Sequence, residues 1–323
     1  MLYLPTPTPK ELNAYFGSIE GKLTAKLKDS SIDDIMKNYL NSVKLKEIIT
    51  DIPERLIAHH TDIMSRLIPA FDEAEFNVYI GLKRKKSPRT PAENIIFHKY
   101  EVSEYLFKIF DYDKIIVKDK GKAYALAKAL NRNTCTYCNR LYTITVTTTK
   151  KGNNITRPQF DHWLAKSRYP LLALSYYNLI PSCSVCNSSV KGDIVFSRQT
   201  HIHPYEIANK EDFTFTYYHK STTEIAVDIT FHGNRIKKTI EDLKIKEIYD
   251  AHSHLELKDL YDLRYKYSED YLDNLLKMFN KLGVSKQEAY RLAFGVEQEE
   301  DDFHKRPFSK FKKDILGQLG VKL

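Results

Sequence analysis

Hydrophobic and polar residues follow a helical period over the first part of the chain. Between Ile32 and Val43 the apolar residues recur every three or four positions, which predicts an amphipathic helix. Ser31 precedes this run and acidic residues follow it, so we expect Ser31 to cap the helix. The sequence Thr90-Pro91-Ala92-Glu93 has the form of a capping box and predicts the start of a second helix. Residues 122–131 are rich in alanine and predict a third.

The hydrophobic period changes to two after residue 140. Residues 141–150 (LYTITVTTTK) predict a strand, and residues 155–162 (ITRPQFDH) predict a strand that returns after a Gly-Asn-Asn turn. Asp161 and His162 are therefore expected at the end of a β-hairpin. Residues 163–193 have no regular period, and we expect an irregular loop that ends in a short helical turn around the second cysteine pair.

The last third of the chain begins with strands and continues with helices. Residues 213–217 and 225–231 alternate between apolar and polar, which predicts two more strands. From about residue 240 the period is helical, and Leu257, Leu260, Tyr267, Tyr271, Leu275 and Phe279 predict a long amphipathic helix that ends near Gly283.

These patterns predict an α+β protein with three regions. We expect a helical N-terminal region (1–130), a compact core (131–210) and a β-hairpin followed by helices (211–323). A chain of 323 residues exceeds the size at which a single hydrophobic core usually stops growing, which agrees with a core and separate flanking regions.

The net charge of the chain favours an anionic partner. The formal charge is +8 and the pI is about 9.0, and nucleic acid is the commonest partner of a basic protein. A basic run between prolines is predicted to be a loop that could follow a phosphate backbone, and it contains Lys83, Arg84, Lys85 and Lys86. A solvated loop without a partner explains the same run equally well.

The composition gives no sign of a membrane protein. No stretch approaches the roughly 20 apolar residues of a membrane-spanning helix. The start, MLYLPTPTPKEL, has neither a basic first part nor an apolar core followed by a cleavage site, so we expect a cytoplasmic protein without a signal peptide. Disulfides are rare in that reducing compartment, so we expect the cysteines to have another role.

All four cysteines fall into two CxxC pairs. The pairs are Cys135 with Cys138 and Cys183 with Cys186, and 44 residues (139–182) separate them. Two CxxC pairs in a reducing compartment match a tetrahedral zinc site with four thiolates. A redox dithiol or an iron–sulfur cluster would use the same residue type, but a redox pair needs no second copy. A closed four-thiolate site leaves no position for water, so we expect the zinc to be structural.

The residues that this zinc would enclose resemble a known nuclease motif. The segment contains FDHW (160–163), then NL (178–179), and the second cysteine pair is followed by Asn187 and by Lys-Gly (191–192). Asp-His, a middle Asn and CxxCN resemble the HNH endonuclease motif in its zinc-containing form, over residues 134 to about 205. The resemblance implies a ββα core built around one catalytic metal ion.

The resemblance also implies roles for single residues. His162 matches the general base, and Asp161 matches the metal ligand that precedes it. Asn178 matches the middle Asn, which holds the loop and helps to orient the base. Asn187 matches the third position, which binds the catalytic metal and is often His, and Lys191 matches the terminal Lys. Asn at the third position favours hard cations such as Mg²⁺ or Mn²⁺.

These roles agree with what phosphodiester hydrolysis requires. An imidazole can accept a proton from water near neutral pH, and a divalent ion on Asp161 and Asn187 can act as a Lewis acid. Lys166, Arg168 and Lys191 are expected to hold phosphates. Taken alone, His162 would more often be an ordinary core or surface histidine. His203 could approach the phosphate, but Pro204 beside it favours a packing role. His59, His60, His252 and His254 lack ligand partners nearby in the sequence and are expected to be structural.

The sequence therefore predicts a metal-dependent HNH endonuclease, with DNA favoured over RNA. The family implies products with a 5′-phosphate and a 3′-hydroxyl. The two flanks would grip substrate, form a homo-oligomer or dock a partner. A looser similarity to HNH effectors of Septu-type and retron anti-phage modules implies an ATPase partner and a role in antiviral defence. The alternatives are an RNA-cleaving nuclease, an inactive zinc-containing nucleic-acid-binding module and a zinc-containing scaffold in a protein complex.

Overall fold

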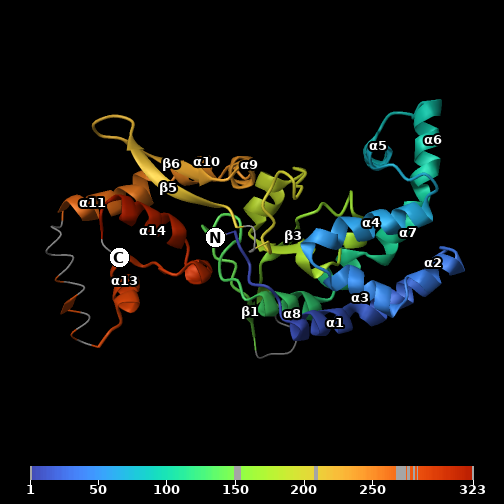
Figure 1. Ribbon diagram of the computed structural model, residues 1–323, viewed down its shortest axis with the longest axis horizontal. Coiled ribbons are helices and arrows are strands. Elements are labelled where there is room, and N and C mark those ends of the chain that lie inside the picture. The colour runs from blue at the N-terminus through green and yellow to red at the C-terminus, as the bar shows by residue number, and fades with distance from the viewer. Residues whose placement is uncertain are drawn as a thin grey trace. The chain divides into compact units, whose positions relative to one another are not determined.

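The chain forms two compact units (Figure 1). The computed structural model describes residues 2–148, 154–206, 210–266 and 283–321, together with residues 274, 277, 278 and 281. Unit 1 consists of Met1–Leu4, Leu130–Phe160 and Pro181–Leu323, and unit 2 consists of Pro5–Ala129 and Asp161–Ile180. Helices and small two-stranded sheets occur together, so the fold is α+β, as predicted.

Unit 2 is built mainly from helices, in agreement with the hydrophobic period of residues 1–130. The helices are α1 (Pro9–Lys28), α2 (Asp34–Tyr39), α3 (Ser42–Thr50), α4 (Pro53–Leu67), α5 (Glu73–Arg84), α6 (Pro91–Tyr100), α7 (Glu104–Ile109) and α8 (Lys120–Leu130). The short helical turns are η1 (Glu101–Ser103), η2 (Asp113–Val117), η3 (Pro170–Leu172) and η4 (Tyr176–Asn178).

Helix α1 shows why these segments are helical. The Thr8 hydroxyl accepts from the Glu11 N–H at 3.3 Å, and the Glu11 carboxylate accepts from the Thr8 N–H at 2.7 Å. This capping box satisfies main-chain donors that have no partner within the helix. The buried side chains of α1 recur at helical spacing and are Tyr15, Phe16, Ile19, Leu23 and Leu27. This face of α1 packs against α3 and α7.

The single helix predicted between Ile32 and Val43 is wrong, because the segment forms two helices. Asp33 is the N-cap in place of Ser31, and its carboxylate accepts from the Met36 N–H at 2.7 Å. Asn41 then accepts from the Lys44 N–H at 3.0 Å and begins α3. A short polar side chain such as that of Asn41 accepts from main-chain donors and can begin a new helix. Asn41 therefore separates the two helices, although the apolar period continues from one to the other.

The basic run 83–86 lies only partly in a loop. Lys83 and Arg84 belong to the last turn of α5, where the helix dipole favours positive charge. Lys85 follows as the C-cap of that helix, and Lys86 lies in the loop. The predicted capping box at the start of α6 is confirmed, since the Thr90 hydroxyl accepts from the Glu93 N–H at 3.3 Å.

Unit 1 contains strands and helices from the second half of the chain. The strands β5 (Asp212–His219) and β6 (Ile225–His232) form an antiparallel hairpin, in agreement with the predicted alternation. The helices described here are α9 (Asn234–Asp242), α10 (Ile245–Asp250), α11 (Lys258–Lys266), α13 (Lys286–Phe294) and α14 (Ser309–Gln318), with short turns η6 (Ser253–Leu257) and η7 (Glu300–Lys305). Helix α14 packs on β5, and α9 and α10 pack on β6 (Figure 1).

An aromatic cluster holds the hairpin to its helices. The Phe215 ring lies 4.4 Å from the Tyr249 ring, and the Tyr249 ring lies 5.1 Å from the Phe311 ring, measured between centroids. All three side chains are fully buried. Burying such rings contributes most of the stabilisation of a small sheet, because a two-stranded hairpin alone is marginal in water.

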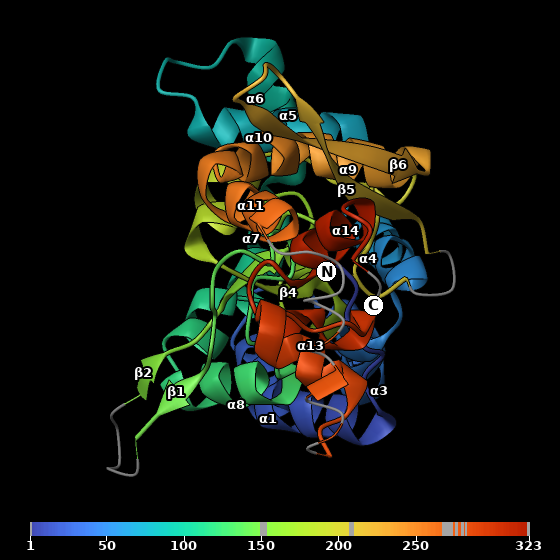
Figure 2. The same ribbon diagram turned by 90° about the vertical axis from the view of Figure 1, so that its left-hand side faces the viewer.

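The hairpin predicted to end at His162 has a different pairing. Strands β1 (Val146–Thr147) and β2 (Asn154–Thr156) pair with each other (Figure 2). Strand β3 (Gln159–His162) instead pairs with β4 (Leu179–Ser182), which the predicted irregular loop did not include. Pro158 lies between β2 and β3, and it separates them because proline has no N–H to donate to a ladder.

The C-terminal predictions are partly confirmed. Leu257 is the last residue of η6, and α11 (Lys258–Lys266) follows it directly, so the start of the predicted helix is helical. The predicted positions Tyr267, Tyr271, Leu275 and Phe279 lie outside the described residues.

Candidate functional site

The four cysteines come together in unit 1 as one buried cluster. Their sulfur atoms all lie within 4.8 Å of one another, and the cysteines form no disulfide. Four thiolates at about 2.3 Å from a tetrahedral zinc would lie roughly 3.8 Å apart. The cluster therefore has the donor type, the donor number and the spacing of a structural zinc site, as the two CxxC pairs predicted.

Turns with main-chain hydrogen bonds position each cysteine pair. In the first pair, the Cys135 N–H donates to the Leu141 carbonyl at 3.0 Å. In the second pair, the Cys186 N–H donates to Cys183 Sγ at 3.4 Å. Burial raises the pKa of the Cys135 thiol, whereas hydrogen bonds from Cys135 and Cys138 lower the pKa of Cys183. A divalent cation would hold all four as thiolates, since metal binding displaces their protons.

A later segment of unit 1 (residues 303–308) covers the first cysteine pair, and sequence reasoning missed this contact. Asn139 directly follows Cys138, and its Nδ2 donates to the Phe303 carbonyl at 2.8 Å. The Phe308 N–H donates back to the Asn139 carbonyl at 2.8 Å. Asn139 has a φ of 47°, a left-handed conformation that asparagine tolerates better than most residues. Nothing in the sequence marks residues 303–308 as partners of the cysteines.

The aromatic cluster also contacts this pair. The Tyr249 hydroxyl donates to the Cys138 carbonyl at 2.6 Å, and burial raises the pKa of Tyr249 well above its usual value. Tyr249 thus stays a neutral hydrogen-bond donor beside the first cysteine pair.

His162 lies in unit 2, where its imidazole has a defined orientation. Its Nε2 lies 2.9 Å from the Ala173 carbonyl oxygen, and its ring lies edge-on to the Tyr112 ring at 4.6 Å. A carbonyl oxygen can only accept, so Nε2 must carry the proton. In the neutral ring Nδ1 is then the acceptor. His162 is 9% exposed, which makes it a largely buried histidine with its tautomer assigned by one main-chain bond.

Asn178 holds together the segment that carries the Ala173 carbonyl. Its Oδ1 accepts from the Leu164 N–H at 2.6 Å. Its Nδ2 donates to the Leu164 carbonyl at 3.0 Å and to the Leu172 carbonyl at 2.9 Å. The side chain is fully buried and cannot touch a substrate, so the structure gives Asn178 a positioning geometry.

The two predicted ligands of the catalytic metal belong to different units. Asp161 is the first residue of the second segment of unit 2 and is 4% exposed. Asn187 belongs to unit 1, where its Nδ2 donates to Gln159 Oε1 at 2.8 Å. A carboxylate oxygen and an amide oxygen are suitable ligands for Mg²⁺ or Mn²⁺. That Asp161 and Asn187 bind the same ion stays a prediction.

The residues predicted to contact phosphate differ in accessibility. The Lys166 ammonium is 3.0 Å from the Asp113 carboxylate, and the two side chains are 44% and 64% exposed. Arg168 is half-buried. Lys191 is 2% exposed, with its ammonium 5.1 Å from the Phe196 ring centre. The burial of Lys191 favours a packing role over a direct phosphate contact.

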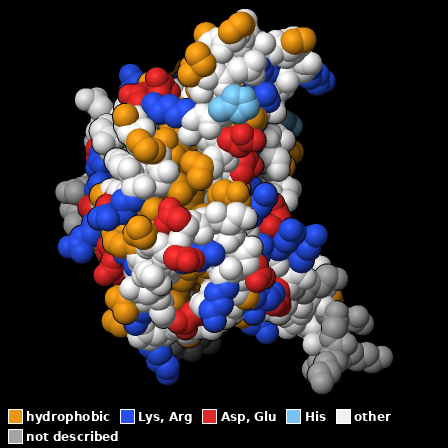
Figure 3. All heavy atoms as spheres, turned by 90° about the vertical axis from the view of Figure 1, so that its right-hand side faces the viewer, with side chains coloured by type: hydrophobic (Ala, Val, Ile, Leu, Met, Phe, Trp, Pro, Cys, Tyr) orange, Lys and Arg blue, Asp and Glu red, His pale blue; other side chains and the backbone are white. Residues whose placement is uncertain are grey.

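The basic run 83–86 is partly neutralised by acidic neighbours. Lys83 pairs with Glu104, and Lys85 lies 2.6 Å from the Glu93 carboxylate. In Figure 3, Lys and Arg side chains alternate with Asp and Glu side chains on the face shown and form no continuous basic field. Surface pairs of this kind contribute little stability and exchange readily with other ions.

His203, His60 and His59 lie in buried or paired positions that suit structural roles, whereas His254 is exposed. His203 is 1% exposed, and burial lowers its pKa to about 3, so it packs as a neutral ring. Burial also lowers the pKa of His60 to about 3, and that ring lies 5.0 Å from the Tyr169 ring. His59 lies 2.8 Å from the Asp51 carboxylate.

Comparison with known proteins adds no assignment. No protein-family model, curated protein or solved structure matches this chain. Among the described residues, no helix combines the length and the apolar character needed to cross a membrane.

Proposed function

We propose that the chain is an HNH-type endonuclease that hydrolyses phosphodiester bonds, with DNA as the favoured substrate. The observation that carries this proposal is the bond between His162 Nε2 and the Ala173 carbonyl, because it leaves Nδ1 as a proton acceptor. A general base needs an acceptor nitrogen in a fixed orientation, and the bond to Ala173 fixes both the tautomer and the orientation of the ring.

The chain around His162 supports the role of a base. When Nδ1 takes a proton from water, the ring becomes an imidazolium whose Nε2–H still donates to Ala173. The carbonyl dipole stabilises that positive charge, so the same contact that selects the tautomer also favours proton transfer. Asn178 keeps this carbonyl in place through its bond to Leu172, the residue before Ala173.

The order of elements supports the proposal of a ββα core. Strands β3 and β4 pair, and the helical turn η5 (Val185–Lys191) follows them directly. Asp161 and Asn187 are the residues that would hold a Mg²⁺ or Mn²⁺ ion. Such an ion, when bound, would supply Lewis-acid stabilisation of the scissile phosphate.

The zinc site would be structural in this enzyme. Its two cysteine pairs enclose residues 139–182, which contain both His162 and Asn178. A metal that joins the ends of this segment reduces the number of unfolded conformations available to it. The zinc would therefore stabilise the segment that carries the base without taking part in the reaction.

The proposal is tested by cleavage of supercoiled plasmid with purified wild type and His162→Ala in Mg²⁺ or Mn²⁺. We expect the substitution to lower the rate by about 10²- to 10⁴-fold, the usual contribution of a general base. His98→Ala is the matched control, because His98 is exposed in α6 of the same unit. Zinc content and melting temperature are measured for every variant.

Two outcomes would contradict the proposal. One is a folded, zinc-loaded His162→Ala protein that cleaves as fast as wild type. The other is a wild type that cleaves neither DNA nor RNA with any divalent ion tested. Cleavage of RNA alone would keep the reaction and change the substrate.

A further inference from the structure

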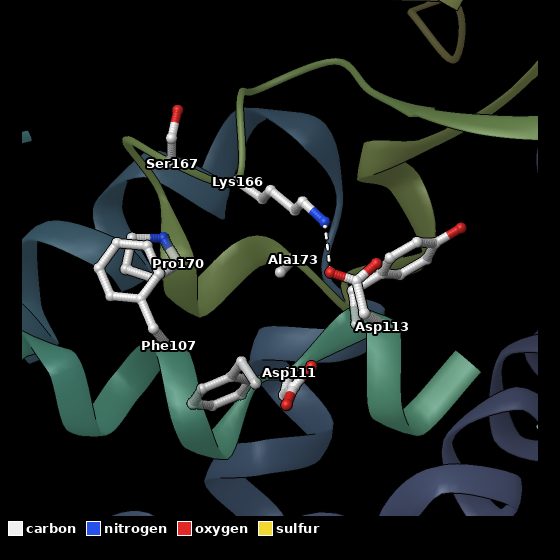
Figure 4. Close-up of a pocket in the computed structure, with 9 residues that line it drawn as sticks. Phe107, Asp111, Asp113, Lys166, Ser167, Pro170 and Ala173 are labelled. Atoms are coloured by element: carbon white, nitrogen blue, oxygen red, sulfur yellow. Dashed lines mark hydrogen bonds and ion pairs between the residues drawn. The ribbon is translucent and has the colours of Figure 1, made fainter. Parts of the chain in front are cut away.

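Unit 2 contains a small pocket (Figure 4), and Ala173, which lines it, accepts a hydrogen bond from His162 through its carbonyl. Its volume is about 230 Å³, which is below the roughly 300–1,000 Å³ of sites for drug-sized ligands. The apolar part of its lining comes from Phe107, Phe110, Pro170 and Ala173. Its charged groups come from Lys166, Asp111 and Asp113. A small, flat ligand with polar edges fits this combination of size and lining.

Two residues belong both to the pocket and to the surroundings of His162. Ala173 lines the pocket, and its carbonyl accepts from His162 Nε2 at 2.9 Å. Tyr112 also lines the pocket, and its ring lies 4.6 Å from the imidazole. Ala173 and Tyr112 therefore each contact both the pocket and the imidazole.

Resting on the proposed nuclease function, we propose that this pocket binds one unstacked nucleobase of a single-stranded nucleic acid, with Lys166 holding the neighbouring phosphate. The Phe107 and Pro170 rings lie together on one side of the pocket (Figure 4) and offer flat apolar surface to a base. Bases stack on aromatic side chains regardless of sequence, because every base has a π-face. The nuclease would then favour single strands, loops or frayed ends over intact duplex.

The ion pair at the pocket can be exchanged for contacts with a nucleotide. Figure 4 shows the Lys166 ammonium reaching to the Asp113 carboxylate, 3.0 Å away. Both side chains are well exposed, so the pair is weak and screened by salt. A phosphate can take over Lys166. The Asp113 carboxylate can then accept a hydrogen bond from an exocyclic amino group.

This exchange predicts a preference among bases. Cytosine, adenine and guanine carry an exocyclic amino group, whereas thymine and uracil do not. The other aspartate is less available for this contact. Asp111 lies 3.6 Å from both Lys26 and Lys114 and is 19% exposed.

A further positive charge lies close to the pocket. The Lys83 ammonium is 4.1 Å from the centre of the Phe107 ring. Lys83 is also paired with Glu104, so its relevance to the pocket is the cation–π contact with a ring of the proposed stacking surface and not its net charge.

The first test is the affinity of the full chain for a fluorescent single-stranded oligonucleotide, measured by anisotropy without added Mg²⁺ or Mn²⁺. We expect Phe107→Ala to weaken binding by roughly 5- to 100-fold, as for loss of one base–aromatic stack. Phe97→Ala is the matched control, because Phe97 is also half-buried in unit 2 and has Arg89 over its ring at 3.5 Å, but it does not line the pocket. Equal affinities of the two variants would overturn the proposal.

The second test asks whether the pocket distinguishes bases. Oligo(dC) should bind more tightly than oligo(dT), and Asp113→Ala should remove most of that difference. RNA versions of both oligonucleotides show which sugar is preferred, since the base contacts are shared. A wild type that binds oligo(dC), oligo(dT) and an abasic oligonucleotide equally would exclude the pocket as a base site.

These results are separate from the test of the nuclease itself. Plasmid cleavage that depends on His162, combined with unchanged oligonucleotide affinity in Phe107→Ala, would keep the nuclease and reject the pocket. Loss of binding in Phe107→Ala, together with no cleavage by wild type, would support the base-binding pocket and reject the nuclease.

Discussion

Buried polar side chains determine the geometry around His162. The Asn178 side chain is fully buried and makes three described hydrogen bonds, all with main-chain atoms. The motif predicted that an Asn at this position holds the loop. The sequence could not show which carbonyls it binds, because they depend on how residues 163–178 fold back.

We predict that Asn178→Ala lowers the free energy of unfolding by about 2–4 kcal/mol, because it leaves buried main-chain groups without partners. Urea denaturation measures this loss. Asn38→Ala in α2, an exposed position, should change the free energy by less than about 0.5 kcal/mol. A shift below about 1 kcal/mol for Asn178→Ala would show that water replaces its bonds.

His60 is predicted to make the protein sensitive to acid. Its pKa is lowered by burial to about 3, so between pH 6.5 and 3 the unfolded chain binds a proton that the folded chain does not. Stability from this residue is therefore present above pH 6.5 and is lost as the pH falls. From pH 7 to pH 5 the loss is about 2 kcal/mol.

The substitution His60→Phe should remove that part of the pH dependence. The measurement compares urea midpoints of wild type and variant at both pH values, with His98→Phe as an exposed control. An identical pH dependence for wild type and His60→Phe would contradict the prediction.

Sequence signals between neighbouring residues predicted individual helices and strands better than they predicted which strands pair. The capping box at Thr90 and the alternation in 225–231 each describe neighbours in the chain, and both are confirmed. The partner of β3 could not be read from the sequence, because β4 is only four residues long and follows a long irregular segment. Pro158 was the available sign that the returning strand is interrupted.

We predict that removing zinc releases the segment 303–308. Its hydrogen bonds with Asn139 exist only while the turn after Cys138 keeps its shape. Hydrogen exchange, measured with and without a zinc chelator, should show faster exchange at Phe308 in the metal-free protein. The amides of the β5–β6 hairpin serve as the internal reference, and unchanged exchange at Phe308 would rule out this coupling.

A matched pair of variants tests the metal itself. Cys183→Ala should lose bound zinc and lower the melting temperature, whereas Ser184→Ala, at the exposed neighbouring position, should keep about one zinc per chain. Metal analysis and thermal denaturation check both. Full zinc content in Cys183→Ala would show that this cysteine is not a ligand.

At the scale of the whole molecule, the two units interleave along the chain. Unit 2 combines Pro5–Ala129 with Asp161–Ile180, which are separated by a segment of unit 1. The later segment contributes to the packing of the helices: Tyr169 Oη donates to Glu73 at 2.8 Å, and η3 packs on α4 and α7. Composition and periodicity could not predict this, since they describe each segment separately.

We therefore predict that a fragment covering residues 5–129 does not fold cooperatively. Circular dichroism should show helix in the fragment but a broad thermal transition, in contrast to the full chain. A sharp transition would mean that the first segment holds a complete core.

Because the segments of unit 2 are far apart in the sequence, this unit cannot complete its core until residues 161–180 have been synthesised. Tyr15 Oη donates to the Leu174 carbonyl at 2.9 Å, across 159 residues of sequence. A ribosome that adds roughly 5–20 residues per second needs several seconds to make residues 130–180 after the first helices exist. During that interval the nascent helices expose the apolar surface that residues 161–180 cover in the folded protein.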